Sequence, residues 1–107
     1  MNEHKQMPFY VIIYDVNAQK FTKYDVMPYF VSYYNERKKS ARPKTYEEFL
    51  DFVKGASLYQ FWSRCEFELV LSPWIYDSPQ TKIDVHDQLM PNIELVTRIL
   101  MYNLGLN

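Results

Sequence analysis

The stretch PFYVIIYD, residues 8–15, decides the fold of this chain. Its large apolar side chains stand at both odd and even positions, whereas a half-exposed strand alternates apolar with polar residues. We therefore predict a strand covered on both faces and central in its sheet. The next stretch, KFTKYDV at residues 20–26, does alternate. It predicts a second strand that pairs with the first as a hairpin, with a turn over residues 17–19.

Two helices are predicted after the hairpin. Asp25 is placed to cap a helix that begins at residues 27–28 and runs to about Lys39, because proline is tolerated in the first turn. Thr45 and Glu48 form a capping box, in which the hydroxyl and the carboxylate each accept a backbone N–H that the helix leaves unpaired. The core-facing residues of this second helix follow helical spacing and are Phe49, Phe52, Val53 and Ala56.

The second half of the chain predicts one more strand and one more helix. Residues 65–71 alternate between apolar and polar side chains and indicate a half-exposed strand, followed by a loop over 72–81. The last helix spans about 85–104, with Gly105 past its end. Pro91 falls inside it and predicts a kink or break near Met90, because proline removes a helical hydrogen bond.

These elements predict an α+β fold, with helices packed on one face of a small antiparallel sheet in the order β-β-α-α-β-α. A chain of 107 residues, 48% apolar and 18% aromatic, fits a single domain over residues 1–107, with 1–7 as a loose N-terminal tail. No apolar run reaches the roughly 18–20 residues of a membrane span, and no secretion signal is visible. With Cys65 as the single cysteine, we expect a cytoplasmic protein without an internal disulfide.

Charge is unevenly distributed along the sequence. The segment 37–44 holds five of the twelve Lys and Arg residues and no acid, which leaves seven cations against thirteen acids elsewhere. This segment could grip phosphates, so one alternative function is nucleic-acid binding. Because the net charge is −1, we favour a solvated helix end and loop. The residues of this alternative are Arg37, Lys38, Lys39, Arg42 and Lys44.

Tyrosine is abundant, with ten residues in the chain, and exposed aromatic side chains are common anchors of protein interfaces. We expect an aromatic contact surface formed by Tyr33, Tyr34, Trp74 and Tyr76. Acidic residues at Glu66, Glu68 and Asp77 would complement it by occupying a partner surface that normally holds nucleic acid.

A second alternative is a small metal-dependent hydrolase centred on His86. Imidazole and carboxylate groups suit divalent metals, and Asp84 and Asp87 lie beside this histidine in sequence. At a helix start, however, the same residues are explained by capping and by the helix dipole. We therefore expect no metal site at Asp84 and His86, no catalytic residue and no cofactor. Nucleophilic catalysis by Cys65 would need His86 as base, and no nucleophile motif surrounds this cysteine.

Five stretches carry a resemblance: FYVIIYDVN and KYDVMPYF near the N-terminus, PKTYEEF at 43–49, YQFWSRCEFE at 59–68 and KIDVHDQL at 82–89. They resemble small uncharacterised proteins encoded by phages and prophages of low-GC Gram-positive bacteria. Small proteins of that setting often bind a host protein, and anti-CRISPR inhibitors are one such group. The resemblance thus implies a host protein as partner, such as a nucleic-acid-processing defence complex, and transfers no mechanism.

From the sequence we expect a non-enzymatic protein-binding module of mobile-element origin. Its expected partner is a bacterial defence nuclease such as a CRISPR effector, which it would inhibit in the cytoplasm of the bacterial host.

Overall fold

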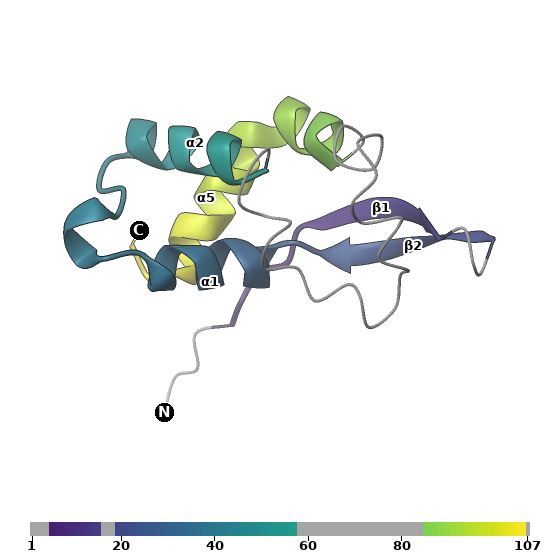
Figure 1. Cartoon of the computed structure of the whole chain (residues 1–107), viewed down its shortest axis with the longest axis horizontal. Coiled ribbons are helices and arrows are strands. Elements are labelled where there is room, and N and C mark those ends of the chain that lie inside the picture. Colours follow the sequence, from purple (N-terminus) through teal and green to yellow (C-terminus); the bar gives the residue numbers. More distant parts are fainter. Residues whose placement is uncertain (1–4, 16–18, 58–84, 107) are drawn as a thin grey trace.

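The computed structural model describes residues 5–15, 19–57 and 85–106. Strand β1 (Tyr10–Asp15) pairs with β2 (Lys20–Asp25) in an antiparallel hairpin whose register runs from Tyr10 opposite Asp25 to Asp15 opposite Lys20 (Figure 1). This confirms the predicted hairpin and, with the helices that follow, the α+β class. The strand predicted over 65–71 and the loop over 72–81 lie outside the described residues.

Helices make up most of the remaining described chain. They are α1 (Met27–Glu36), α2 (Tyr46–Gly55) and α5 (Ile93–Asn103), with 3₁₀ turns η1 (Lys39–Ala41) and η5 (Met90–Asn92) and a helical segment at 85–89. Helix α5 packs against both α2 and α1, as Figure 1 shows. The order in the described residues is therefore strand, strand, helix, helix, helix.

The prediction that β1 is covered on both faces is wrong. Val11 and Ile13 are buried, at 0% and 4% exposure, but Tyr10, Ile12 and Tyr14 on the opposite face are 51%, 42% and 44% exposed. The physical reason is that tyrosine is amphipathic, since its ring can lie on a sheet while its hydroxyl stays in water. Apolar residues at both parities therefore do not require a cover on both faces.

Helix α1 ends earlier than predicted, at Glu36 and not near Lys39. Arg37 already has an extended backbone, with φ −77° and ψ 148°, and Lys39 lies in the separate 3₁₀ turn η1. At the other end, Asp25 Oδ1 accepts the N–H of Met27 at 3.0 Å and that of Phe9 at 3.1 Å. Although Val26 is the N-cap by backbone conformation, the Asp25 carboxylate does pair with the first turn, and it also fixes the entry into β1.

Helix α2 begins as predicted. Thr45 Oγ1 accepts the N–H of Glu48 at 3.1 Å, and Glu48 Oε1 accepts the N–H groups of Thr45 at 3.0 Å and Lys44 at 2.8 Å. Both halves of the capping box are therefore present. The predicted inward residues Phe49, Phe52, Val53 and Ala56 are all buried.

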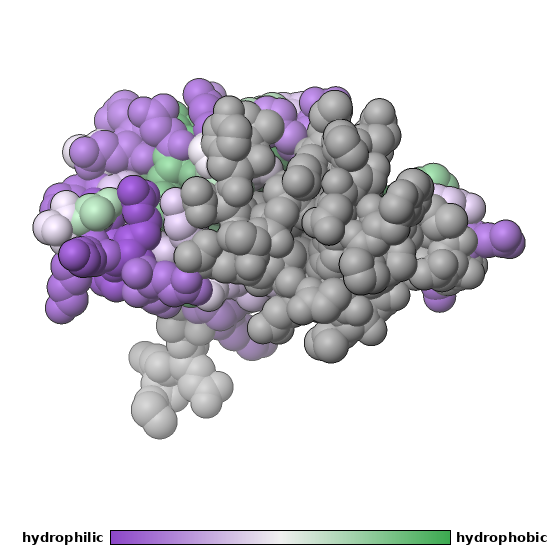
Figure 2. All heavy atoms as spheres, viewed as in Figure 1, coloured by the Kyte–Doolittle hydropathy of each residue, from purple (hydrophilic) through white to green (hydrophobic). Residues whose placement is uncertain are grey.

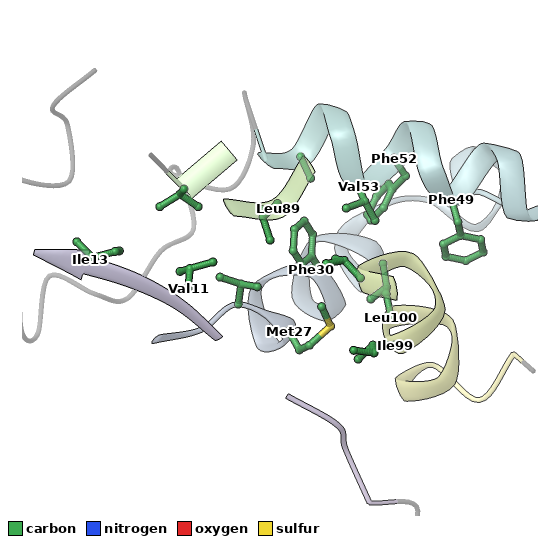
Figure 3. Packing of buried hydrophobic residues seen from close by; sticks show 14 residues of the cluster. Val11, Ile13, Met27, Phe30, Phe49, Phe52, Val53, Leu89, Ile99 and Leu100 are labelled. Atoms are coloured by element: carbon green, nitrogen blue, oxygen red, sulfur yellow. The ribbon is translucent and has the colours of Figure 1, made fainter. Parts of the chain in front are cut away.

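The predicted break at Pro91 is also present. Residues 85–89 are helical, η5 follows over Met90–Asn92, and α5 then begins at Ile93. Gly105 lies past the end of α5 with a φ of +74°, a left-handed conformation that favours glycine. The break lets Leu89 and Leu100, which are both buried, approach the core from helical segments of different direction (Figure 3).

The hydrophobic core joins the hairpin to the helices. Figure 3 shows Val11 and Ile13 of β1 at one end of the cluster, Phe30 and Leu89 in the middle, and Phe49 of α2 at the far end. Burial of each large apolar side chain contributes roughly 1.5–3 kcal/mol, so the hairpin is held to the helices mainly through its inward face.

Two carboxamide side chains bind the N-terminal backbone to the C-terminal helices. Gln88 Oε1 accepts the N–H of Ile12 at 2.7 Å, and its Nε2 donates to the carbonyl of Ile12 at 2.8 Å. Asn103, buried at 7% exposure, pairs with the N–H and carbonyl of Met7 in the same way, at 2.7 and 2.9 Å. We call these two contacts the carboxamide clamps. The second clamp ties Met7 to α5, and Gln6 Nε2 donates to the main-chain carbonyl of Asn103 at 3.1 Å.

Replacing the buried amide tests the second clamp. We expect Asn103→Leu to lower the free energy of unfolding by roughly 1–3 kcal/mol, because both backbone groups of Met7 lose their partner. Urea denaturation followed by circular dichroism measures the change. The control, Asn35→Leu at an exposed position of α1, should change stability by no more than about 0.5 kcal/mol. Equal effects of the two substitutions would contradict a role for the clamp.

Glu48 makes the free energy of unfolding depend on pH. The backbone N–H groups of Lys44 and Thr45 lower the pKa of its carboxyl group below the ordinary value of 4.5. Its stabilising effect is therefore complete above the ordinary pKa and is lost as pH falls through the lower, folded-state pKa. We expect Glu48→Gln to flatten the pH dependence of unfolding free energy in this acidic range. Glu47→Gln is the control, because it leaves the two backbone bonds in place and should keep the steeper slope.

Candidate functional site

His86 makes a hydrogen bond that is structural in character. Its Nδ1 lies 3.0 Å from Ser57 Oγ, and the same hydroxyl lies 2.9 Å from the carbonyl oxygen of Lys54. A hydroxyl has one hydrogen, so both bonds form together only if Ser57 donates to Lys54 and accepts from His86 Nδ1–H. Ser57 is fully buried. The pair thus joins the end of α2 to the segment 85–89, and it does not have the proton arrangement of an activated serine nucleophile.

The predicted alternative of a metal site involves residues that the structure describes only in part. Asp84, Glu66, Glu68 and Cys65 lie outside the described residues. Within residues 5–15, 19–57 and 85–106, no group of three or more His, Cys, Asp and Glu side chains is arranged to hold a metal ion. His86 is described, and its observed contact is the one with Ser57.

Arg42, from the basic segment, caps the C-terminal end of α1. Its Nε donates to the carbonyls of Tyr34 and Arg37, both at 3.1 Å, and its Nη2 donates to that of Asn35 at 2.9 Å. The guanidinium also lies 4.9 Å from the centre of the Tyr34 ring. The Tyr34 carbonyl also accepts the backbone N–H of Arg37 at 3.2 Å. Arg42 thus adds side-chain donors to carbonyls at and just after the end of α1, in the way a C-terminal cap does.

The other cations of segment 37–44 differ in their surroundings. Arg37 lies over the rings of Tyr33 and Phe52, at 5.6 and 5.4 Å from their centres, and Lys44 Nζ donates to the carbonyl of Arg42. Lys38 and Lys39 are exposed. Figure 2 shows hydrophilic residues gathered at this end of the molecule, where α1 is followed by η1 and α2. Three of the five cations thus contact carbonyls or rings of the protein, whereas Lys38 and Lys39 are exposed.

Of the four residues in the predicted aromatic surface, the structure describes Tyr33 and Tyr34. Tyr33 and Tyr34 are half-buried, and their rings stack on Phe52 and Phe49 of α2, at centroid distances of 5.0 and 5.8 Å. They therefore contribute to the packing of α1 on α2. The other predicted contact residues, Trp74, Tyr76, Glu66, Glu68 and Asp77, lie outside the described residues.

A different aromatic surface is exposed on the outward face of the hairpin. The register places Tyr14 opposite Phe21 and Ile12 opposite Lys23, so these side chains share the face that points away from Val11 and Ile13. Phe21 is 71% exposed, and its ring meets that of Tyr14 edge to face at 5.1 Å. Lys23 Nζ lies 5.0 Å from the centre of the Tyr10 ring. We call Tyr10, Ile12, Tyr14, Phe21 and Lys23 the outer hairpin face.

Sequence reasoning missed this face, although a signal was present. Phe21, Lys23 and Asp25 occupy alternate positions of the second strand, and two charges at one parity mark that side as solvent-facing. Paired residues of a hairpin lie on the same face, so the even-numbered residues of the first strand, which pair with these positions, also face solvent. The error came from treating β1 alone, without the register that links it to β2.

Comparison with known proteins adds no relative from which a role could be transferred: no protein-family model, curated protein or solved structure matches the chain. None of the helices in the described part of the chain is long and apolar enough to cross a membrane.

The bonds from Arg42 to the end of α1 predict an effect on stability. We expect Arg42→Met to lower the free energy of unfolding by about 1–2 kcal/mol, because three main-chain carbonyls lose a charged donor. Lys39→Met removes one charge from the same segment at an exposed position and should change it by less than about 0.5 kcal/mol. Denaturant titration compares the two variants. If they were equally destabilised, charge alone would account for the effect and the capping role would be refuted.

Proposed function

We propose that this chain is a non-enzymatic protein-binding module whose contact surface is the outer hairpin face. The observation that carries the proposal is the exposure of Phe21, at 71%, together with Tyr10 and Tyr14 on the same side of the sheet. Large aromatic side chains bring much of the free energy of protein association when they enter a pocket of the partner. Burying one phenylalanine contributes on the order of 2 kcal/mol.

The organisation of this face supports the proposal. Tyr14 and Phe21 hold each other through an edge-to-face contact, and both strands are paired along their length. Side chains held in place before binding lose less conformational entropy when a partner covers them. A rigid pair of rings on a hairpin is therefore a better anchor than the same residues on a loop.

The contacts of the other candidates also support this choice. Ser57 donates its hydroxyl to a main-chain carbonyl and not to His86, and Arg42 is committed to the end of α1. A catalytic role for the first pair would require its hydroxyl bond to be exchanged, and the Nε group of Arg42 is already used by main-chain carbonyls. The outer hairpin face needs no such rearrangement.

The resemblance to phage and prophage proteins extends the proposal to the partner. We expect a protein of the bacterial host cytoplasm, specifically a defence nuclease such as a CRISPR effector, whose activity the module inhibits by covering a functional surface. In this setting the hairpin aromatics would enter an apolar pocket, and the acidic residues Glu66, Glu68 and Asp77 would face basic residues that otherwise bind nucleic acid.

Partner capture tests this function. The purified chain serves as bait in lysate of a low-GC Gram-positive host, captured proteins are identified by mass spectrometry, and the dissociation constant is then measured with the purified partner. We expect Phe21→Ser to weaken binding tenfold or more, since a central aromatic anchor contributes about 2 kcal/mol or above.

Leu95→Ser is the matched control, because Leu95 is 52% exposed and lies on α5, away from the hairpin strands. It should leave the dissociation constant within about twofold. Equal weakening by both substitutions would reject the outer hairpin face as the contact surface. Binding to single-stranded DNA that falls steeply with salt and is lost in the Lys38→Glu, Lys39→Glu variant would instead support the nucleic-acid function.

A further inference from the structure

The two edges of the hairpin differ in how their backbone groups are paired. Ile12 of β1 bonds with both its N–H and its carbonyl to the Gln88 side chain, at 2.7 and 2.8 Å, so the edge of β1 has a partner there. The Phe9 carbonyl accepts the N–H of Val26 at 3.0 Å and so faces the other strand. In an antiparallel pair such inward and outward residues alternate, which makes the odd-numbered residues of β1 the ones that bond to β2.

Phe21 and Lys23 carry the backbone groups of the opposite edge. Lys23 lies opposite Ile12, an even-numbered residue, so its N–H and carbonyl point away from β1, and those of Phe21 do the same. In the part of the chain that the structure describes, β1 is the one sheet neighbour of β2, and no residue bonds to these backbone groups. Such an edge is a template on which an extended peptide can add as a further strand.

The side chains along this edge define what such a peptide must carry. Lys20 and Lys23 are exposed, whereas the acidic residue of β2, Asp25, already accepts two main-chain N–H groups through Oδ1. The Lys23 ammonium lies on the outward face, 5.0 Å from the centre of the Tyr10 ring. A carboxylate opposite it on an added strand, with about 5 Å between the Cβ atoms, would lie within its reach. The edge therefore presents positive charge beside the exposed ring of Phe21.

We propose that β2 binds an extended acidic segment of the partner protein by adding it as an antiparallel third strand. This inference rests on the proposed function, because it names the form in which the partner meets the hairpin. One partner residue then lies opposite Lys23, where a carboxylate is favoured, and another opposite Phe21, where an aromatic or β-branched side chain is favoured. Backbone bonds supply affinity, and these two positions supply specificity. A second copy of this chain fits less well, because its own β2 would bring Lys20 and Lys23 against an equally basic edge.

Fluorescence polarisation of the full chain with a labelled synthetic peptide, Ser-Val-Glu-Thr-Tyr-Glu-Ser, tests this inference. Antiparallel addition places the first Glu of the peptide opposite Lys23, its Thr opposite Thr22 and its Tyr opposite Phe21. We expect saturable binding of one peptide per chain. N-methylation of the Tyr amide, which points at β2, should weaken binding roughly tenfold or more, because a backbone bond is lost. N-methylation of the Thr amide, which points away from β2, is the matched control and should change affinity by less than about twofold.

Substitutions in the protein test the charge of the edge. Lys23→Glu should weaken peptide binding by about tenfold, since like charges then lie opposite each other. Lys54→Glu, at an exposed position of α2, is the charge-matched control and should leave the affinity within about twofold.

Equal weakening by the two N-methylated peptides, or by the two Lys variants, would overturn the proposal, as would the absence of saturable binding. Self-association of the chain that Lys23→Pro abolishes would identify a second copy as the occupant of this edge and overturn it too. A captured partner whose affinity falls in Phe21→Ser, without any binding of the peptide, would remove this inference alone. Peptide binding, together with a captured partner that is insensitive to Phe21→Ser, would instead remove the proposed contact surface.

Discussion

The position of the hairpin depends on two carboxamide side chains that come from the far end of the sequence. Gln88 and Asn103 each pair with both backbone groups of one residue near the N-terminus, Ile12 and Met7 respectively. Each amide therefore gives one residue the N–H and C=O partners that a neighbouring strand would supply. Apolar burial of Val11 and Ile13 is non-directional, whereas these hydrogen bonds specify one orientation of the hairpin on the helices.

This orientation determines what the molecule presents to its surroundings. With Val11 and Ile13 turned toward the helices, the alternation of the strands turns Tyr14 and Phe21 away from them. A shift of one residue in the strand would exchange the two faces and bury the aromatic residues at the cost of the aliphatic ones. The clamps and the outer hairpin face are thus two results of the same register. The same junction fixes where α1 begins, because Asp25 is both the last residue of β2 and an acceptor for the first turn of α1.

Local features could be read from the sequence where one chemical rule dominates. The capping box of Thr45 and Glu48 and the break at Pro91 rest on backbone hydrogen bonding within a few residues, and both occur as predicted. The end of α1 could not be read in this way, because it depends on Arg42 reaching back five to eight residues to the helix carbonyls. The exposed aromatic face depends on strand register, which is a property of the assembled hairpin.

The sequence separation of the carboxamide clamps has a consequence for the order of folding. The hairpin and α2 form from contacts within a few tens of residues, but the clamp bonds join residues 76 and 96 positions apart. Contacts between distant residues carry the largest loop-closure entropy and tend to form after the local ones. The clamp bonds therefore form after the folding transition state. Their strength sets the unfolding rate of the native state and has little influence on the folding rate.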